Sequence, residues 1–140
     1  MITSNLVVYE ELADDEGIEL VLLGGMVRRE YRSLVGFLTE DNLRQLHADW
    51  LFLGTSGVRP GGQVMDTTVV EVPVKRAMIK AAEKVVLLAD AQKFPGTGMA
   101  KVCGPEDLDA VVTNAPVDPA TRSSLEEAGV EVVVAGKVKA

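Results

Sequence analysis

Small and charged residues follow the predicted β-strands of this chain at several points. Gly24 and Gly25, with Arg28 close behind, follow one apolar run, and Gly54-Thr55-Ser56-Gly57 follows the next. Glycines let backbone N–H groups approach phosphate oxygens, and an arginine supplies the counter-charge. Ligands of open parallel sheets bind beyond the carboxyl ends of the strands. We therefore expect an anionic, hydroxylated ligand at this edge of the sheet.

Carboxylates and lysines form the second group of candidate site residues. Asp90 follows a third apolar run, with Lys93 three residues further on. The helix that carries Lys75 leaves Asp66-Thr67-Thr68 and Glu71 in a loop that faces the same crevice. Carboxylates accept hydrogen bonds from sugar hydroxyls, and lysines supply positive charge. Two simpler interpretations stay open: Asp90 and Lys93 form a solvated loop pair, or Glu71 and Lys75 form an i,i+4 pair on a helix surface.

Other chemistries find less support in the sequence. One histidine and one cysteine leave only carboxylates as further ligands, so no metal site is expected. His47 lies at a polar helix end and is expected to be exposed, whereas Trp50 is expected in the core. Cys103 is expected to be structural rather than nucleophilic. No catalytic residue and no cofactor is expected.

Length and composition limit the class of protein. The 140 residues suit one domain over 1–140, and 47% hydrophobic with 25% charged residues is typical of a globular chain. The net charge of −7 argues against DNA binding by this chain itself. The single cysteine suits the reducing cytosol, and no apolar run reaches the roughly 18 residues of a membrane span. We expect a cytoplasmic protein with no membrane partner.

Periodicity predicts strands that alternate with helices. Short apolar runs predict strands over 18–23, 50–53, 85–89, 110–113 and 130–135. Helical patterns lie over 6–13, with Asn5 as N-cap, near 39–47, over 74–84 with a start near Pro73, and from Asp118-Pro119 to Gly129. Because most strands are continuously apolar, they are expected to be buried on both faces of a parallel sheet. The predicted fold is α/β, a mostly parallel, Rossmann-like sheet with flanking helices.

Seven short segments along the chain form a recognisable series. They are Thr3-Ser4-Asn5-Leu6; Leu22-Leu23-Gly24-Gly25; Ser33-Leu34-Val35-Gly36; Phe52-Leu53-Gly54 with Gly57; Glu71 with Val74-Lys75-Arg76-Ala77-Met78-Ile79; Leu87-Leu88-Ala89-Asp90 with Lys93-Phe94; and Val112-Thr113-Asn114. In this order they resemble the C-terminal sensor domain of DeoR-type bacterial transcription regulators. The resemblance implies a fold similar to ribose-5-phosphate isomerase and the coenzyme A transferases, without catalysis. It also implies a phosphorylated sugar or related metabolite as effector, and a homo-oligomer.

The resemblance also implies a set of ligand-binding residues. Glycines and hydroxyls would donate to phosphate or sugar oxygens, Lys75 and Lys93 would be counter-charges, and Glu71 and Asp90 would accept from sugar hydroxyls. The full set is Ser4, Asn5, Gly24, Gly25, Arg28, Ser56, Gly57, Asp66, Thr67, Glu71, Lys75, Asp90 and Lys93.

The sequence departs from the family pattern in two places. No helix-turn-helix precedes Met1, and the strand and Gly-Thr-Thr-type loop that usually open the sensor are missing. We therefore expect an N-terminally truncated sensor that reaches DNA only through a domain absent from this chain. Asp66 stands where a hydroxyl is frequent, which disfavours a phosphate at that point.

Two other functions remain open at this level. The first is a sugar-phosphate isomerase, in which Asp90 or Glu71 is the general base and Lys93 stabilises the enediolate. The second is an oligomerisation fragment that binds no ligand. The missing strand and helix would leave a sheet edge and apolar surface exposed, and self-association would cover them.

Overall fold

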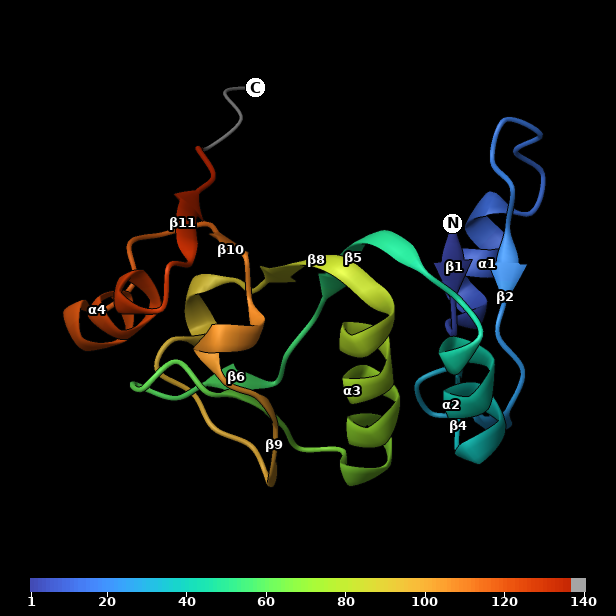
Figure 1. The fold of residues 1–140 in the computed structure, drawn as a ribbon, viewed down its shortest axis with the longest axis horizontal. Helices are drawn as coiled ribbons and strands as arrows, with labels where there is room; N and C mark the ends of the chain where they lie inside the picture. The colour runs from blue at the N-terminus through green and yellow to red at the C-terminus, as the bar shows by residue number, and fades with distance from the viewer. Residues whose placement is uncertain (137–140) are drawn as a thin grey trace.

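Four parallel strands form the central sheet in this computed structural model, which describes residues 1–136 (Figure 1). Their order across the sheet is β11 (Glu131–Val134), β10 (Ala110–Thr113), β8 (Ala82–Leu88) and β5 (Ala48–Leu53). All three pairings are parallel, which confirms four of the five predicted strands. The expected domain over 1–140 includes residues 137–140, which lie outside the described residues.

Three small sheets surround this centre. β1 (Ile2–Thr3) and β2 (Val21–Leu22) pair in parallel, so the strand predicted over 18–23 shortens to two residues. The antiparallel pieces had not been predicted from the sequence. They are the pair β3 (Met26–Arg28) and β4 (Ser33–Val35), and the sheet of β6 (Gly57–Val58), β7 (Val64–Asp66) and β9 (Ala100–Cys103).

All four predicted helices are present, with shifted ends. They are α1 (Leu6–Leu12), α2 (Phe37–Arg44), α3 (Val72–Ala81) and α4 (Pro119–Glu127). Short 3-10 helices cover Val69–Glu71, Ala91–Lys93 and Pro105–Asp107. Asn5 caps α1 as expected, because its Oδ1 accepts from the amides of Val7 and Val8 at 2.8 and 3.2 Å. Within residues 1–136, no helix is both long and apolar enough to cross a membrane.

Two hydrophobic clusters form the core, and α3 packs into both. The larger cluster joins the central sheet to β6, β7, β9 and α4, and Val72 of α3 belongs to it. The smaller cluster joins the β2 end, β4 and α2, and Val74 of α3 belongs to that one. In Figure 1, α3 accordingly stands between the sheet and the segment that holds β1, β2 and α2. The helix that carries Lys75 is thus fixed from two sides.

One face of the central sheet is covered by the described residues, whereas much of the other face is exposed. Leu53 and Leu87 point into the larger cluster and are buried, whereas their neighbours Phe52 and Leu88 point the other way and are exposed. Trp50 lies on that same open face and is 56% exposed. The predictions that the strands are buried on both faces and that Trp50 lies in the core are therefore wrong. Continuous apolar sequence had indicated two covered faces, but on the second face Trp50, Phe52 and Leu88 are exposed.

Candidate functional site

A cavity of about 350 Å³ lies at the carboxyl end of β5, next to the start of α3. It is closed on one side by the β1–α1 connection and on another by the turn after β7. The expected site residues that line it are Ser4, Asn5, Ser56, Asp66, Thr67, Glu71 and Lys75. This part of the predicted site is therefore brought together at the predicted end of a parallel strand.

Lys75 and Asp66 form the charged floor of this cavity. The Nζ of Lys75 lies 2.6 Å from Oδ2 of Asp66 and donates to the carbonyl oxygen of Gly54 at 3.2 Å. The other carboxylate oxygen of Asp66 accepts from the amide of Thr68 at 2.8 Å and from the hydroxyl of Ser56 at 3.3 Å. Asp66 is 4% exposed and both of its oxygens are engaged, so its role is to position Lys75.

The surroundings keep Asp66 ionised. Burial alone would raise the pKa of this carboxyl, because a charge is poorly solvated there. The hydrogen bonds from Lys75 and from the amide of Thr68, the charge of Lys75 and the Ser56 hydroxyl together outweigh burial. They hold the pKa of Asp66 below its ordinary value of 3.8. The cavity floor is therefore an ion pair at neutral pH.

A second ion pair joins Glu71, which lines the cavity, to Arg28, which lies behind it and does not line the cavity itself. The Nη1 of Arg28 lies 2.6 Å from Oε1 of Glu71, and the hydroxyl of Ser33 donates to the same oxygen at 2.7 Å. The Arg28 guanidinium also stacks over Tyr31, 4.5 Å from the ring centroid. Glu71 and Lys75 do not pair with each other, so the helix-surface interpretation of their spacing is wrong. Within residues 1–136, Oε2 of Glu71 has no hydrogen-bond partner and can accept from a ligand.

Hydroxyl groups complete the rim. The Oγ of Ser56 lies 3.2 Å from Oγ1 of Thr67 and accepts from the Thr67 amide at 3.1 Å. The hydroxyl of Thr55 contacts the carbonyl oxygens of Gly57 and Met65 at 2.9 and 2.8 Å, which fixes the β5–β6 turn against β7. Donors and acceptors for a hydroxylated ligand therefore sit on a backbone that is held in place.

Gly24 and Gly25 lie away from this cavity and pack against α2. The amide of Gly24 donates to Oδ1 of Asn42 at 2.9 Å, and its carbonyl oxygen accepts from Thr39 at 2.6 Å. A Cβ on Gly25, whose φ is +147°, would lie 2.0 Å from the Thr39 hydroxyl oxygen. These glycines therefore permit close helix packing, and their predicted contact with a ligand stays untested.

Gly57, Asp90 and Lys93 also do not line the cavity. A Cβ on Gly57 would lie 2.5 Å from the amide nitrogen of Thr97, so this position is occupied by the 96–98 loop. Asp90 caps the 3-10 helix Ala91–Lys93 by accepting from the amide of Gln92 at 2.9 Å. Asp90 and Lys93 keep a structural interpretation here, and their role as ligand contacts remains a prediction.

Four further residues line the cavity without having been assigned a ligand contact from the sequence. Tyr31 was not singled out at all, whereas Ser33, Thr55 and Thr68 lay in segments that were. Their signal was weak because no pattern of spacing links them to Lys75. Cys103 is buried as expected, and burial with nearby Asp107 raises the pKa of its thiol to about 12, which disfavours nucleophilic chemistry.

Taken together, the cavity combines two compensated ion pairs with hydroxyls and a free carboxylate oxygen. Two cations and two anions leave no net charge among Arg28, Lys75, Asp66 and Glu71. Such a set can hold a polyhydroxylated molecule, and Lys75 retains a third N–H for an anionic group. The arrangement fits a small polar metabolite better than a large apolar one.

Sequence comparisons place the chain in a family. The profile described as the DeoR C terminal sensor domain matches residues 1–115. The glycerol-3-phosphate regulon repressor of Escherichia coli K12 is 33% identical over 83% of this chain and 46% of its own length. The transcriptional repressor GlcR of Bacillus subtilis is 31% identical, over 96% and 52%. The regulator GlpR of Haloferax volcanii is 32% identical, over 86% and 47%.

The extent of these matches shows what kind of unit the chain is. It spans about half the length of the curated relatives it matches, and the profile covers most of the chain. The profile reaches from β1 to the end of β10 and so includes every residue of the cavity. The chain belongs to the family of DeoR C-terminal sensor domains.

Proposed function

We propose that the cavity at the end of β5 binds a phosphorylated sugar or a related small anionic metabolite. The observation that carries this proposal is the placement of Lys75, which is held by Asp66 and Gly54 with one N–H left over. An anionic oxygen of the ligand would accept a hydrogen bond from that N–H and a second one from the hydroxyl of Thr67. Sugar hydroxyls would donate to the free oxygen of Glu71.

The family relationship supports this ligand class. One relative is named for the regulon of glycerol 3-phosphate, which is a phosphorylated polyol. Several relatives are named as helix-turn-helix transcription regulators or repressors. We infer that this chain is the effector-sensing part of such a regulator, and that DNA control passes through an attached helix-turn-helix domain. Helix α3 carries Lys75 and packs into both core clusters. A ligand that displaces Lys75 would therefore move α3 and change the packing of both clusters.

Fold and extent belong to the same proposal. We propose that residues 1–140 act as one sensing unit and that the sheet is similar to that of ribose-5-phosphate isomerase and the coenzyme A transferases. The parallel strand order β11-β10-β8-β5 supports this likeness. A cytoplasmic location follows from the proposed role in transcription.

Thermal shift and calorimetry with a panel of ligands test the proposal. The panel contains glycerol 3-phosphate, hexose 6-phosphates, the same sugars without phosphate, and inorganic phosphate. At least one phosphorylated member should raise the Tm, and the bare sugars should not, because binding to the folded state stabilises it by mass action.

A variant pair locates the binding. Lys75→Gln should weaken the response at least about tenfold, because it removes a charged hydrogen bond. Lys101→Gln should leave the response unchanged, since Lys101 is an exposed residue of β9 outside the cavity. No stabilisation by any panel member at millimolar concentration would contradict the proposal, as would an equal loss in both variants.

Three observations weigh against the isomerase alternative. Asp90 and Lys93, its proposed base and electrostatic group, lie outside the lining of the cavity. Glu71, the other candidate base, has its Oε1 engaged by hydrogen bonds from Arg28 and Ser33. The relatives are named as regulators of transcription rather than as enzymes. We therefore propose sensing without turnover.

Self-association is the second part of the proposal. Trp50 and Phe52 are 56% and 62% exposed on the open face of the sheet, and Leu88 and Val133 are exposed there as well. A parallel sheet is normally covered on both faces, and large apolar patches mark interaction surfaces. We propose that a second copy of the chain covers this face.

Light scattering tests this self-association. The parent protein should be a dimer or a larger species, and Phe52→Lys should convert it to a monomer. A monomeric parent protein at about 100 µM would contradict the proposal.

A further inference from the structure

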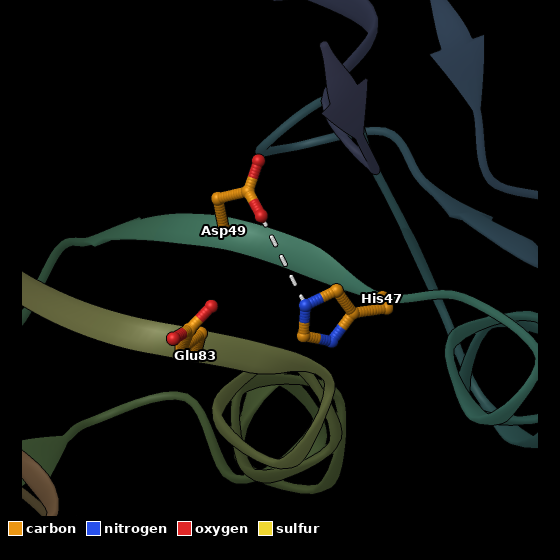
Figure 2. Close-up of side chains that lie close together, drawn as sticks. All are labelled: His47, Asp49 and Glu83. Carbon is orange, nitrogen blue, oxygen red and sulfur yellow. Dashed lines mark ion pairs between the residues drawn. The ribbon is translucent and has the colours of Figure 1, made fainter.

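His47, Asp49 and Glu83 form a compact group of metal-ligating side chains at the amino-terminal ends of β5 and β8 (Figure 2). One ligand atom from each residue lies within 4.8 Å of the other two, and Nε2 of His47 is 3.9 Å from Oδ1 of Asp49. Figure 2 shows the imidazole and the two carboxylates around one open space. The cavity at the far end of β5 shares no residue with this group.

The strand register explains why these side chains meet. Ala48 lies beside Ala82 and Trp50 beside Lys84, so Asp49 lies directly beside Glu83. His47 precedes Asp49 by two residues, which directs both side chains to one face of an extended chain. The pairing of the two strands thus fixes the backbone positions of Asp49 and Glu83, and His47 directly precedes β5. Only the torsions of the exposed side chains remain adjustable.

Two carboxylates stand side by side in this group without a lysine or arginine partner. Carboxylates beside each other on neighbouring strands repel. Among the ion pairs of residues 1–136, none joins Asp49 or Glu83 to a lysine or arginine, and Asp49 contacts only the imidazole of His47. A bound cation would turn this repulsion into attraction.

We propose that His47, Asp49 and Glu83 bind a divalent transition-metal ion of the Zn²⁺ type, with water in the remaining position. Imidazole nitrogen with carboxylate oxygens suits Zn²⁺ better than Mg²⁺ or Ca²⁺, which prefer oxygen ligands alone. Ligand atoms about 2.1 Å from a tetrahedral Zn²⁺ lie about 3.4 Å apart, so small side-chain rotations close the observed spacing. This proposal departs from the expectation of no metal site, because strand pairing brings Glu83 beside Asp49, which the sequence spacing does not indicate.

The test is a Zn²⁺ titration followed by NMR, on protein first treated with a chelator. The chain has one histidine, so its imidazole signals report His47 without ambiguity. Zn²⁺ should shift these signals and the backbone amides of Asp49 and Glu83, and should raise the Tm by linking β5 to β8. A tenfold excess of Mg²⁺ or Ca²⁺ should not displace it.

Variants separate this site from chance binding. His47→Gln and Glu83→Gln should each weaken Zn²⁺ binding at least about tenfold. Loss of a residue that only hydrogen-bonds to a metal ligand typically costs about 10–100-fold, and loss of the ligand itself should cost no less. Glu131→Gln is the matched control, an exposed carboxylate at the start of β11, and should bind like the parent chain. All these residues are exposed, so the variants should fold. The proposal is overturned if millimolar Zn²⁺ leaves the His47 signals unmoved, or if binding survives both substitutions unchanged.

Discussion

The two ends of β5 carry charges that are arranged in opposite ways. At its carboxyl end, Lys75 and Asp66 satisfy each other and are tied to Gly54 and Thr68 by hydrogen bonds. At its amino-terminal end, Asp49 and Glu83 are exposed side by side, and among residues 1–136 neither pairs with a lysine or arginine. The charges near the carboxyl end are thus already paired within the protein, whereas the two carboxylates at the amino-terminal end have no lysine or arginine within the described part of the chain to neutralise them.

The two faces of β5 differ in the same sense. Leu53 is 2% exposed within the larger cluster, and the preceding residue Phe52 is 62% exposed on the open face. One strand thus contributes buried core residues on one face and exposed apolar residues on the other. The contrast separates residues that stabilise this chain through their own burial from apolar residues that the described part of the chain leaves exposed.

The sharpest test of this contrast compares two neighbours on β5. Leu53→Ala should destabilise the protein by about 3 kcal/mol, because it removes buried methyl groups and leaves a cavity. Phe52→Ala should cost less than about 1 kcal/mol in the monomer, although it removes more atoms. Urea unfolding at low protein concentration measures both free energies, and equal losses would show that the open face is covered in solution.

The cavity floor gives the next largest effect. Lys75→Met should destabilise the chain by about 2 kcal/mol, because Asp66 keeps its charge in a buried place without a cation. The double variant with Asp66→Asn should recover part of that loss, since the unpaired charge is gone. Arg122→Met, which breaks an exposed pair with Glu126, is the control and should cost less than about 0.5 kcal/mol.

Acid should weaken the cavity end selectively. The folded pKa of Asp66 lies below its ordinary 3.8, so its ionisation stabilises the protein above that pH. This contribution is lost as the pH falls through the lower, folded pKa. The stability difference between the parent chain and Asp66→Asn should therefore shrink below about pH 4. Denaturation between pH 6 and pH 2.5 measures it, and a difference that stays constant would be inconsistent with the ion pair.

The amino-terminal end should give the smallest effect, and of opposite sign. Glu83→Gln removes one of two adjacent negative charges and should raise the Tm by about 1 °C in metal-free buffer. Added salt should shrink this gain, because screening weakens repulsion between exposed charges. A fall in Tm would mean that Glu83 already has a stabilising partner.

Those elements of the fold that are determined by neighbouring residues could be predicted from the sequence. The helices α1 and α4 were predictable from their caps, Asn5 and Asp118, and the long apolar strands from their composition. The strands of the antiparallel sheets are only two to four residues long, which is too short to show an alternation of apolar and polar residues; they are β3, β4, β6, β7 and β9.

The site was predictable only in part, for the same reason. Ser56, Asp66, Glu71 and Lys75 were identified as site residues, but their pairing was not. Arg28 meets Glu71 across 43 positions of sequence, and no local spacing encodes such a contact. Gly25 packs against Thr39, and a glycine that permits helix packing has the same sequence signature as one that binds phosphate.

Chemical-shift mapping with a phosphorylated sugar tests the central claim most directly. The probe is the member of the panel with the largest thermal shift, titrated into ¹⁵N-labelled protein. We predict that the amides of Ser56, Thr67 and Thr68 move first and that those of His47 and Asp49 stay in place. Shifts confined to the 24–28 or 90–93 segments, or none at millimolar ligand, would contradict the account.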